Sequence, residues 1–207
     1  MSYQNKDITS ENLIQTLDEI QNMYYNVLIL YNAHAKGNQE FTNLANLTFY
    51  ILWNYSKFII VLKLFFTSTH RCEQDFAIGQ LCVTINESIK HLIGFKTKKG
   101  RNWNKTMWIK CCGNYISNYP HLEQAYNDIT DRLISFADNF ENDSTLKNLR
   151  NIATHGDDTI PELLKLNQIT FSVISHYLDG WGRCLRLASD FAFKCFIKEC
   201  QHEMNNK

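Results

Sequence analysis

The segment Arg150–His155, with the sequence RNIATH, carries residue types that suit phosphate chemistry. Arg150 is the only one of six arginines followed by Asn and then by His after four to six intervening residues. Its guanidinium stays charged and can donate two hydrogen bonds to phosphate oxygens. The His155 imidazole titrates near neutral pH and can move a proton, and the Asn151 amide can orient either the phosphate or a catalytic side chain. These groups suit attack of a ribose 2′-hydroxyl on its neighbouring phosphorus without a metal.

The spacing of this motif sets a geometric condition. On an ideal helix, Arg150 and His155 would lie about 140° apart around the axis and about 7.5 Å apart along it. They would therefore not share one helix face. Either the helix ends near Thr154 and Gly156 lets His155 turn round, or a second subunit completes the site. A place at the helix C-terminus would favour the imidazolium, and so favours His155 as a proton donor.

A purely structural interpretation of the motif is also open. In it, Arg150 pairs with Asp143 or Asp157, and His155 caps the last carbonyls of a helix that stops at Gly156. The remaining histidines lack an arginine at the matching position, and we expect them at the surface or at core edges. They are His34, His70, His91, His121, His176 and His202.

A second region that bears on function is the stretch from Ser88 to Leu122. It holds seven basic residues and no Asp or Glu, although the whole chain has 21 of each sign and no net charge. Such a stretch suits contact with a nucleic-acid backbone, and interleaved aromatic residues could stack on bases. The predicted RNA-binding residues are Lys96, Lys98, Lys99, Arg101 and Lys105, and the interleaved aromatics are Trp103, Trp108, Tyr115 and Tyr119.

Two other interpretations of this basic stretch stay open. The sequence Lys98-Lys99-Gly100-Arg101 can form a solvated connection while the aromatics face the core. A surface that binds an acidic protein would have the same composition. The composition therefore predicts a basic surface without deciding its partner.

Apolar residues at three- and four-residue intervals predict the helices that must position these groups. Residues 95–120 break this pattern and predict a loop with a short helix. The predicted stripes are Leu13–Tyr31, Leu44–Phe65, Ala77–Leu92, Leu122–Phe140, Leu146–Ile152, Leu164–Leu178 and Leu185–Glu199.

Capping residues and glycines predict where these helices begin and end. Asp143 or Ser144 can cap the start of the motif helix, and Gly156 can end it. Gly94 is the expected end of the third helix. Thr159 and Pro161 predict the start of the next one, and Gly180-Trp181-Gly182 should break or bend it before a last helix begins near Arg183.

Length and composition fix the class of fold. Among 207 residues, 44% are hydrophobic, and only 2 Pro and 8 Gly are available for turns. That is too few for an all-β fold, while the chain is long enough to bury a core. With no repeat or linker, the sequence predicts one all-α domain over residues 1–207, an up-and-down helical bundle.

The seven cysteines and the polar N-terminus predict a cytoplasmic protein. An odd count with no C-x-x-C pair fits a reducing compartment better than a disulfide framework, and the N-terminus does not resemble a signal peptide. Cys195, Cys200 and His202 lack a second ligand pair, so we predict no metal and no cofactor. The apolar stretch Leu47–Phe66 is long enough to span a bilayer, but polar residues interrupt it, so we predict a core helix and no membrane contact.

The motif Arg-Asn-x-x-x-His at Arg150–His155, on a helix of an all-α domain, resembles the HEPN superfamily. Its defining pattern is Arg, four to six residues and His, often with a polar residue after the Arg. The resemblance implies a four-helix bundle core, here with additional N-terminal helices, that forms a homodimer and brings two motifs into one cleft. It covers about residues 120–180. A Tyr two residues after the His marks the subgroup that pairs with nucleotidyltransferase-like antitoxins, and Asp157 at this position argues against that subgroup.

The resemblance also implies an activity. Members of the superfamily are metal-independent endoribonucleases that leave cyclic phosphate and 5′-hydroxyl ends. They act as toxins with antitoxin partners, in phage defence and in RNA processing, while others only bind nucleotides or RNA. The expected function is therefore an endoribonuclease in defence or toxicity, with Arg150, Asn151 and His155 as catalytic residues. The alternative is a non-catalytic helical module that binds RNA, a nucleotide or a protein.

Overall fold

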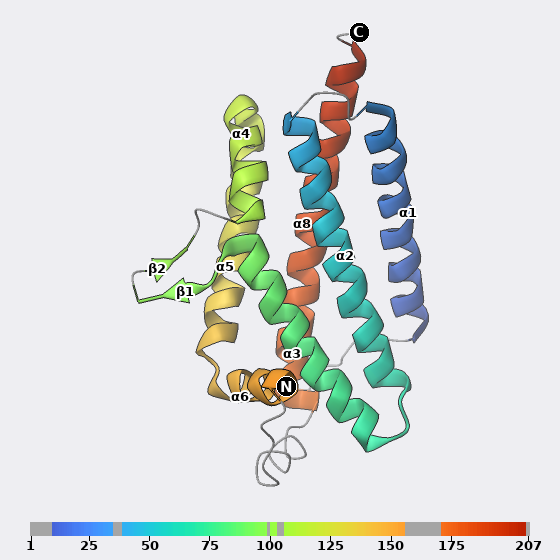
Figure 1. Cartoon of the computed structure of the whole chain (residues 1–207), viewed down its shortest axis with the longest axis vertical. Helices are drawn as coiled ribbons and strands as arrows, with labels where there is room; N and C mark the ends of the chain where they lie inside the picture. The colour runs from blue at the N-terminus through green and yellow to red at the C-terminus, as the bar shows by residue number, and fades with distance from the viewer. Residues whose placement is uncertain (1–9, 35–38, 99, 103–105, 156–170, 206–207) are drawn as a thin grey trace, which may run out of the picture.

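Two central helices, α2 and α8, organise an elongated bundle (Figure 1). The computed structural model describes residues 10–34, 39–98, 100–102, 106–155 and 171–205. The predicted all-α helical bundle is confirmed. The helices are α1 (Ser10–His34), α2 (Gln39–Thr67), α3 (Arg71–Ile93), α4 (Asn114–Asn118), α5 (Glu123–Asn142), α6 (Ser144–His155) and α8 (Phe171–Asn205).

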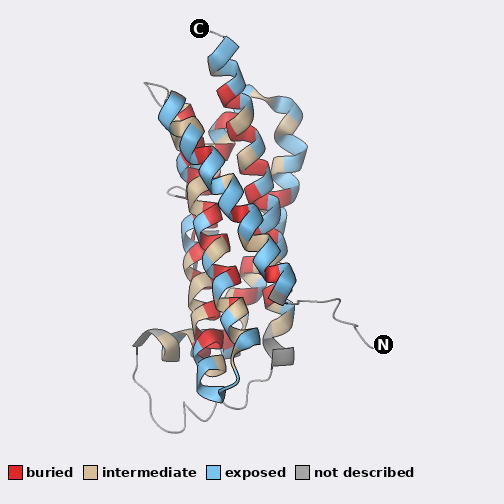
Figure 2. Ribbon diagram, turned by 90° about the vertical axis from the view of Figure 1, so that its right-hand side faces the viewer, coloured by how far each residue is buried: buried red, intermediate tan, exposed pale blue. Residues whose placement is uncertain are grey.

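The apolar helix α2 contacts three other helices, although Trp53 and Ile60 on its outer side are 54% and 55% exposed. It packs against α1, α3 and α8, and α5 packs against α8. Figure 2 shows buried residues along the inner faces of the helices over the whole length of the bundle. Within the described residues, α2 is the one helix that is long and apolar enough to cross a membrane. That is weak evidence for a span, because central helices of bundles have the same composition.

The last helix does not break at Gly180-Trp181-Gly182, so the predicted start of a separate helix near Arg183 was wrong. Helix α8 runs without interruption from Phe171 to Asn205. A Cβ at Gly180 would lie 3.1 Å from two ring carbons of Phe136 on α5, and one at Gly182 would lie 3.4 Å from the Phe58 ring on α2. These glycines therefore let neighbouring helices approach closely. The predicted helix start at Thr159 and Pro161 lies outside the described residues.

The motif helix α6 crosses one end of the bundle, against α3 and α5 (Figure 1). It buries Leu146 and Leu149. The predicted cap at Asp143 is confirmed, since its Oδ1 accepts hydrogen bonds from the backbone N–H groups of Thr145 and Leu146 at 2.8 and 3.2 Å. Its Oδ2 accepts a bond from the Tyr177 hydroxyl at 2.8 Å, which ties the start of α6 to α8.

Residues 95–120 contain a short hairpin in addition to the predicted loop and short helix. Strands β1 (Lys96–Thr97) and β2 (Gly100–Arg101) pair antiparallel, with Lys96 opposite Arg101. A π-helical turn over Trp108–Gly113 then leads into α4, and a 3-10 turn over Pro120–Leu122 precedes α5. The predicted end of α3 at Gly94 is confirmed, and Gly94 has φ 77.

Two of the four aromatic residues in the basic stretch belong to the core of the bundle. Trp108 and Tyr115 are both 0% exposed. The Trp108 Nε1–H donates to the Thr130 hydroxyl at 2.8 Å, and its ring stacks on Tyr126. The prediction that RNA bases stack on Trp108 or Tyr115 is therefore wrong, because both rings are packed inside the bundle. Trp103 lies outside the described residues.

All seven cysteines are free thiols. Cys72 is exposed and Cys111 is half-buried, while the other five are buried. Burial raises the pKa of Cys82 and of Cys195 to about 12, and that of Cys184 to about 11. Since the thiolate is the reactive form, these buried thiols are protected both by packing and by protonation.

Removal of the α6 cap should destabilise the protein. We expect Asp143→Ala to lower the free energy of unfolding by about 1–2 kcal/mol, because two backbone N–H groups lose their acceptor. Asp143→Asn keeps a capping oxygen and should stay within about 0.5 kcal/mol of the wild type. Urea unfolding followed by circular dichroism measures both. Equal losses in the two variants would contradict the capping role.

The thiols should differ sharply in reactivity. In the native protein we expect fast reaction of a disulfide reagent such as DTNB with Cys72 alone, slower reaction at Cys111, and reaction of the other five only after unfolding. The Cys72→Ser variant should lose the fast phase. Absorbance at the thionitrobenzoate band counts the thiols in each phase, and a fast phase that survives in Cys72→Ser would show that the bundle opens.

Candidate anion-binding site around Arg150

A cavity of about 320 Å³ lies where α3, α5, α6 and the start of the hairpin meet. Its rim carries four basic side chains from three separate parts of the chain. Lys90 lies on α3, Lys96 on β1, and Lys147 and Arg150 lie one helical turn apart on α6. The fold thus brings the motif arginine and part of the predicted basic stretch into one cavity.

The rest of the cavity lining is mostly uncharged. Asn86 and Asn142 contribute amides, and Glu141 contributes the one carboxylate in the lining. Phe140 and Leu146 are core residues, with exposures of 4% and 1%. With four cations and one carboxylate, the cavity suits an anionic ligand better than a cationic one.

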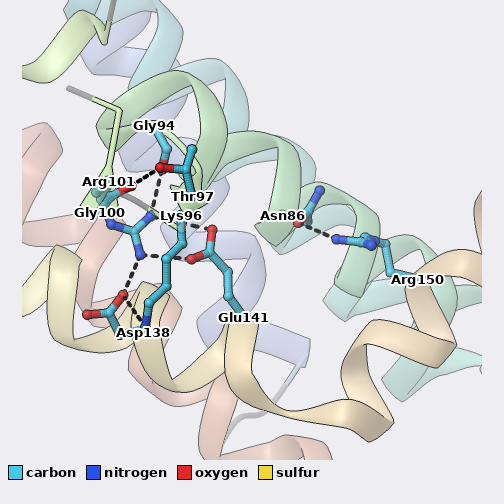
Figure 3. A network of polar contacts seen from close by, with 9 residues as sticks. All are labelled: Asn86, Gly94, Lys96, Thr97, Gly100, Arg101, Asp138, Glu141 and Arg150. Carbon is cyan, nitrogen blue, oxygen red and sulfur yellow. Dashed lines mark hydrogen bonds and ion pairs between the residues drawn. The ribbon is translucent and has the colours of Figure 1, made fainter. Parts of the chain in front are cut away.

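The Arg150 guanidinium is oriented by two amide oxygens, and Figure 3 shows the one that belongs to Asn86. Its Nη1 donates to Asn86 Oδ1 on α3 at 3.0 Å. Its Nη2 and Nε donate to Asn151 Oδ1, at 2.9 and 3.3 Å. Asn86 is only 3% exposed, so a buried amide of another helix fixes the direction of the guanidinium.

A chain of polar contacts leads from Arg150 to Lys90. Asn86 Nδ2 donates to Glu87 Oε1 at 3.1 Å, and the same oxygen accepts from Lys90 Nζ at 2.7 Å. The hydrogen bond from Lys90 is the main cause that lowers the pKa of Glu87. Because the Asn86 amide group donates to Glu87, its oxygen is directed to Arg150, so the contact has a defined orientation.

The helix α6 ends at the motif, as the sequence predicts. It is helical from Ser144 to His155, so the separation of about 140° between Arg150 and His155 applies to the backbone of this helix. The side chain of His155 lies outside the described residues. Asn151 is exposed next to Arg150.

One of the two carboxylates offered by the structural interpretation of the motif, Asp143, has other hydrogen-bond partners. Asp143 uses both carboxylate oxygens for the α6 cap and for the Tyr177 hydroxyl. The other proposed partner, Asp157, lies outside the described residues. The geometry around Asp143 therefore assigns this carboxylate to helix capping.

Arg101, predicted to bind RNA, holds the hairpin on α5 (Figure 3). Its Nη1 donates to the Gly94 carbonyl at 2.6 Å, and its Nη2 contacts Asp138 Oδ1 at 2.7 Å and Glu141 Oε2 at 2.8 Å. Its side chain is only 5% exposed. These bonds give Arg101 a structural role, because its guanidinium is already engaged by two carboxylates.

The other predicted RNA-binding lysines have different positions. Lys96 lies at the cavity and is 3.6 Å from Asp138 Oδ1. Lys98 is exposed on the hairpin connection, whereas Lys99 and Lys105 lie outside the described residues. Neither Lys147 nor Asn86 was predicted from the sequence to be a site residue. The three-residue spacing of Lys147 and Arg150 could have indicated the former, but Asn86 is 64 residues away in sequence and carried no such signal.

The described part of the chain contains no group of three His, Cys, Asp or Glu side chains that could hold a metal ion. No family model, curated protein or solved structure matches the chain. The resemblance of Arg150–His155 to the HEPN pattern therefore stays an expectation from the motif. The kind of ligand that the cavity can bind therefore follows from the residues that line it.

Loss of the Arg101 contacts should destabilise the hairpin and the bundle. We expect Arg101→Ala to cost about 2–3 kcal/mol, since it leaves Glu141 and Asp138 without their main partner. The cost is below that of a fully buried pair, because Asp138 is 40% exposed. Thermal and urea unfolding measure it. As a matched control, Arg183→Ala breaks an exposed pair with Asp179 and should cost no more than about 0.5 kcal/mol.

Proposed function

We propose that this protein is a metal-independent endoribonuclease in which Arg150 binds the phosphate that is cleaved. The observation that carries the proposal is the cavity in which Arg150 lies with Lys90, Lys96 and Lys147. Cations from three parts of the chain converge there, which is the arrangement that binding of a phosphodiester backbone requires.

The role of Arg150 follows from its fixed orientation. A guanidinium held by Asn86 and Asn151 does not have to reorganise when negative charge develops on a phosphate. Such preorganised donors stabilise a transition state more than flexible ones do. Both amide oxygens are neutral, so these bonds orient the cation without cancelling its charge. Asn151 would thus act chiefly as a positioning residue.

His155 would move the proton. Its place at the last residue of α6 favours the imidazolium and thus proton donation to the leaving 5′-oxygen. Because the helix separates His155 from Arg150, we propose that two copies of the chain together form one site. In a two-fold dimer, the partner's His155 would complete the cavity formed by Arg150. The resemblance extends this proposal to a cytoplasmic enzyme of phage defence or a toxin, with an antitoxin protein as its regulator.

A non-catalytic RNA-binding module is the second candidate. The observation in its favour is the regular helix through Arg150–His155, in which the two backbone positions lie about 140° apart around the axis of one chain. Such a module would bind RNA at the same cavity, with affinity that falls as salt rises, but would not cleave it.

Cleavage of RNA in the presence of EDTA tests the first candidate. We expect Arg150→Ala and His155→Ala each to lower the cleavage rate by at least about 100-fold, as loss of a transition-state donor or a proton-transfer group does. New 5′-hydroxyl ends, detected by labelling with polynucleotide kinase, should appear with the wild type. His176→Ala and Arg183→Ala remove an exposed histidine and an exposed arginine elsewhere, and should keep the wild-type rate.

Unfolding curves must accompany these assays, because Arg150→Ala leaves the buried Asn86 oxygen without this donor. Arg150→Lys keeps a cation and serves as a second variant. Mixing Arg150→Ala with His155→Ala tests the shared site: half of the dimers would regain one complete site, so about a quarter of the wild-type activity should return. Unchanged cleavage in both single variants would refute the enzyme, and RNA binding without any cleavage would favour the second candidate.

A further inference from the structure

We infer that Phe95, at the rim of the Arg150 cavity, is a stacking platform for an RNA base. The inference deepens the proposed function and rests on it for the nature of the ligand, an unpaired nucleotide of an RNA strand. The cavity would hold the phosphate with Lys147 and Arg150, while the base lies on the Phe95 ring.

The exposure of Phe95 is the first support. It is 51% exposed although it lines a cavity whose other apolar residues, Phe140 and Leu146, are almost fully buried. Among the residues that the structure describes, no other aromatic ring stacks on Phe95. An exposed aromatic ring beside several cations offers the two features that single-stranded nucleic acid uses, a flat apolar surface and positive charge.

The rigidity of the backbone around Phe95 is the second support. The residue before it, Gly94, has φ 77, and a Cβ there would lie only 2.1 Å from the Asn102 carbonyl oxygen. The Gly94 carbonyl accepts a bond from Arg101, and the Phe95 carbonyl accepts one from the Asn102 N–H at 3.1 Å. The contacts of Arg101 with α5 (Figure 3) thus hold the backbone on both sides of Phe95 in place before any ligand arrives.

The size and charge of the cavity are the third support. Its volume of about 320 Å³ lies at the lower end of the range for small-molecule sites, so it suits one nucleotide rather than a duplex. Among the described residues, Lys147 has no carboxylate partner, whereas Lys90 and Lys96 are paired with Glu87 and Asp138. Lys147 on α6 therefore brings to the cavity a positive charge that no carboxylate among the described residues offsets.

Binding of a short RNA whose 2′-hydroxyls are methylated tests the inference, because this probe cannot be cleaved by 2′-hydroxyl attack. Fluorescence anisotropy with the full chain gives the affinity, and competition by inorganic tripolyphosphate reports the cation site without a base. We expect Phe95→Ala to weaken RNA binding about tenfold and to leave tripolyphosphate binding unchanged. Phe95→Trp should keep the RNA affinity, and Lys147→Ala should weaken the binding of both probes.

Phe76→Ala is the matched control, since Phe76 is 59% exposed on α3 and does not line the cavity. It should bind both probes as the wild type does. RNA affinity unchanged in Phe95→Ala, or an equal loss for RNA and tripolyphosphate, would overturn the inference. So would binding of a polyglutamate peptide that is as tight as RNA binding and equally dependent on Phe95.

The cleavage assay separates this inference from the proposed function. Cleavage that depends on Arg150 but not on Phe95, together with unaltered RNA binding in Phe95→Ala, would overturn the stacking platform and keep the enzyme. Binding that depends on Phe95 without any cleavage would keep the platform and refute the enzyme.

Discussion

The hydrogen bond between Arg150 and Asn86 is the constraint on which the candidate site depends. It joins α6 to α3 across 64 residues of sequence, and its acceptor is a buried amide. A buried polar group must be hydrogen-bonded to offset its lost hydration, so the two side chains fix one another. Because the acceptor is neutral, this bond gives the guanidinium a direction without itself cancelling its charge.

Arg101 shows how partners change the role of the same side chain. Two carboxylates and a carbonyl engage its guanidinium, and the result is a hairpin held against α5. Arg150 is instead bonded to two amides at the cavity. From the sequence, both arginines are cations near Asn residues, and nothing in either local pattern distinguishes them. The difference comes from what α3 and α5 place opposite each side chain.

The predictable part of the fold is the part that local sequence controls. Helical periodicity located the main helices, and Asp143 and Gly94 marked a helix start and a helix end through caps and backbone conformation. Gly180 and Gly182 do not end a helix, because their role is steric and depends on Phe136 and Phe58 in other helices. The hairpin has strands of only two residues, too short for a periodic signal. The cavity itself could not be predicted, since its lining comes from segments up to 64 residues apart.

The carboxylates around the cavity explain how several cations can share it. Like charges at close range repel one another, and that cost would destabilise the fold without a ligand. Glu87 beside Lys90, and Asp138 beside Lys96, offset the repulsion on the α3 and hairpin sides. On α6 the charge of Arg150 is stabilised by amide oxygens, which accept hydrogen bonds but carry no net charge. Lys147, on the same helix, also lines the cavity. Under the proposed function, a phosphate would bind to Arg150 and Lys147, which lie on the helix that also carries His155.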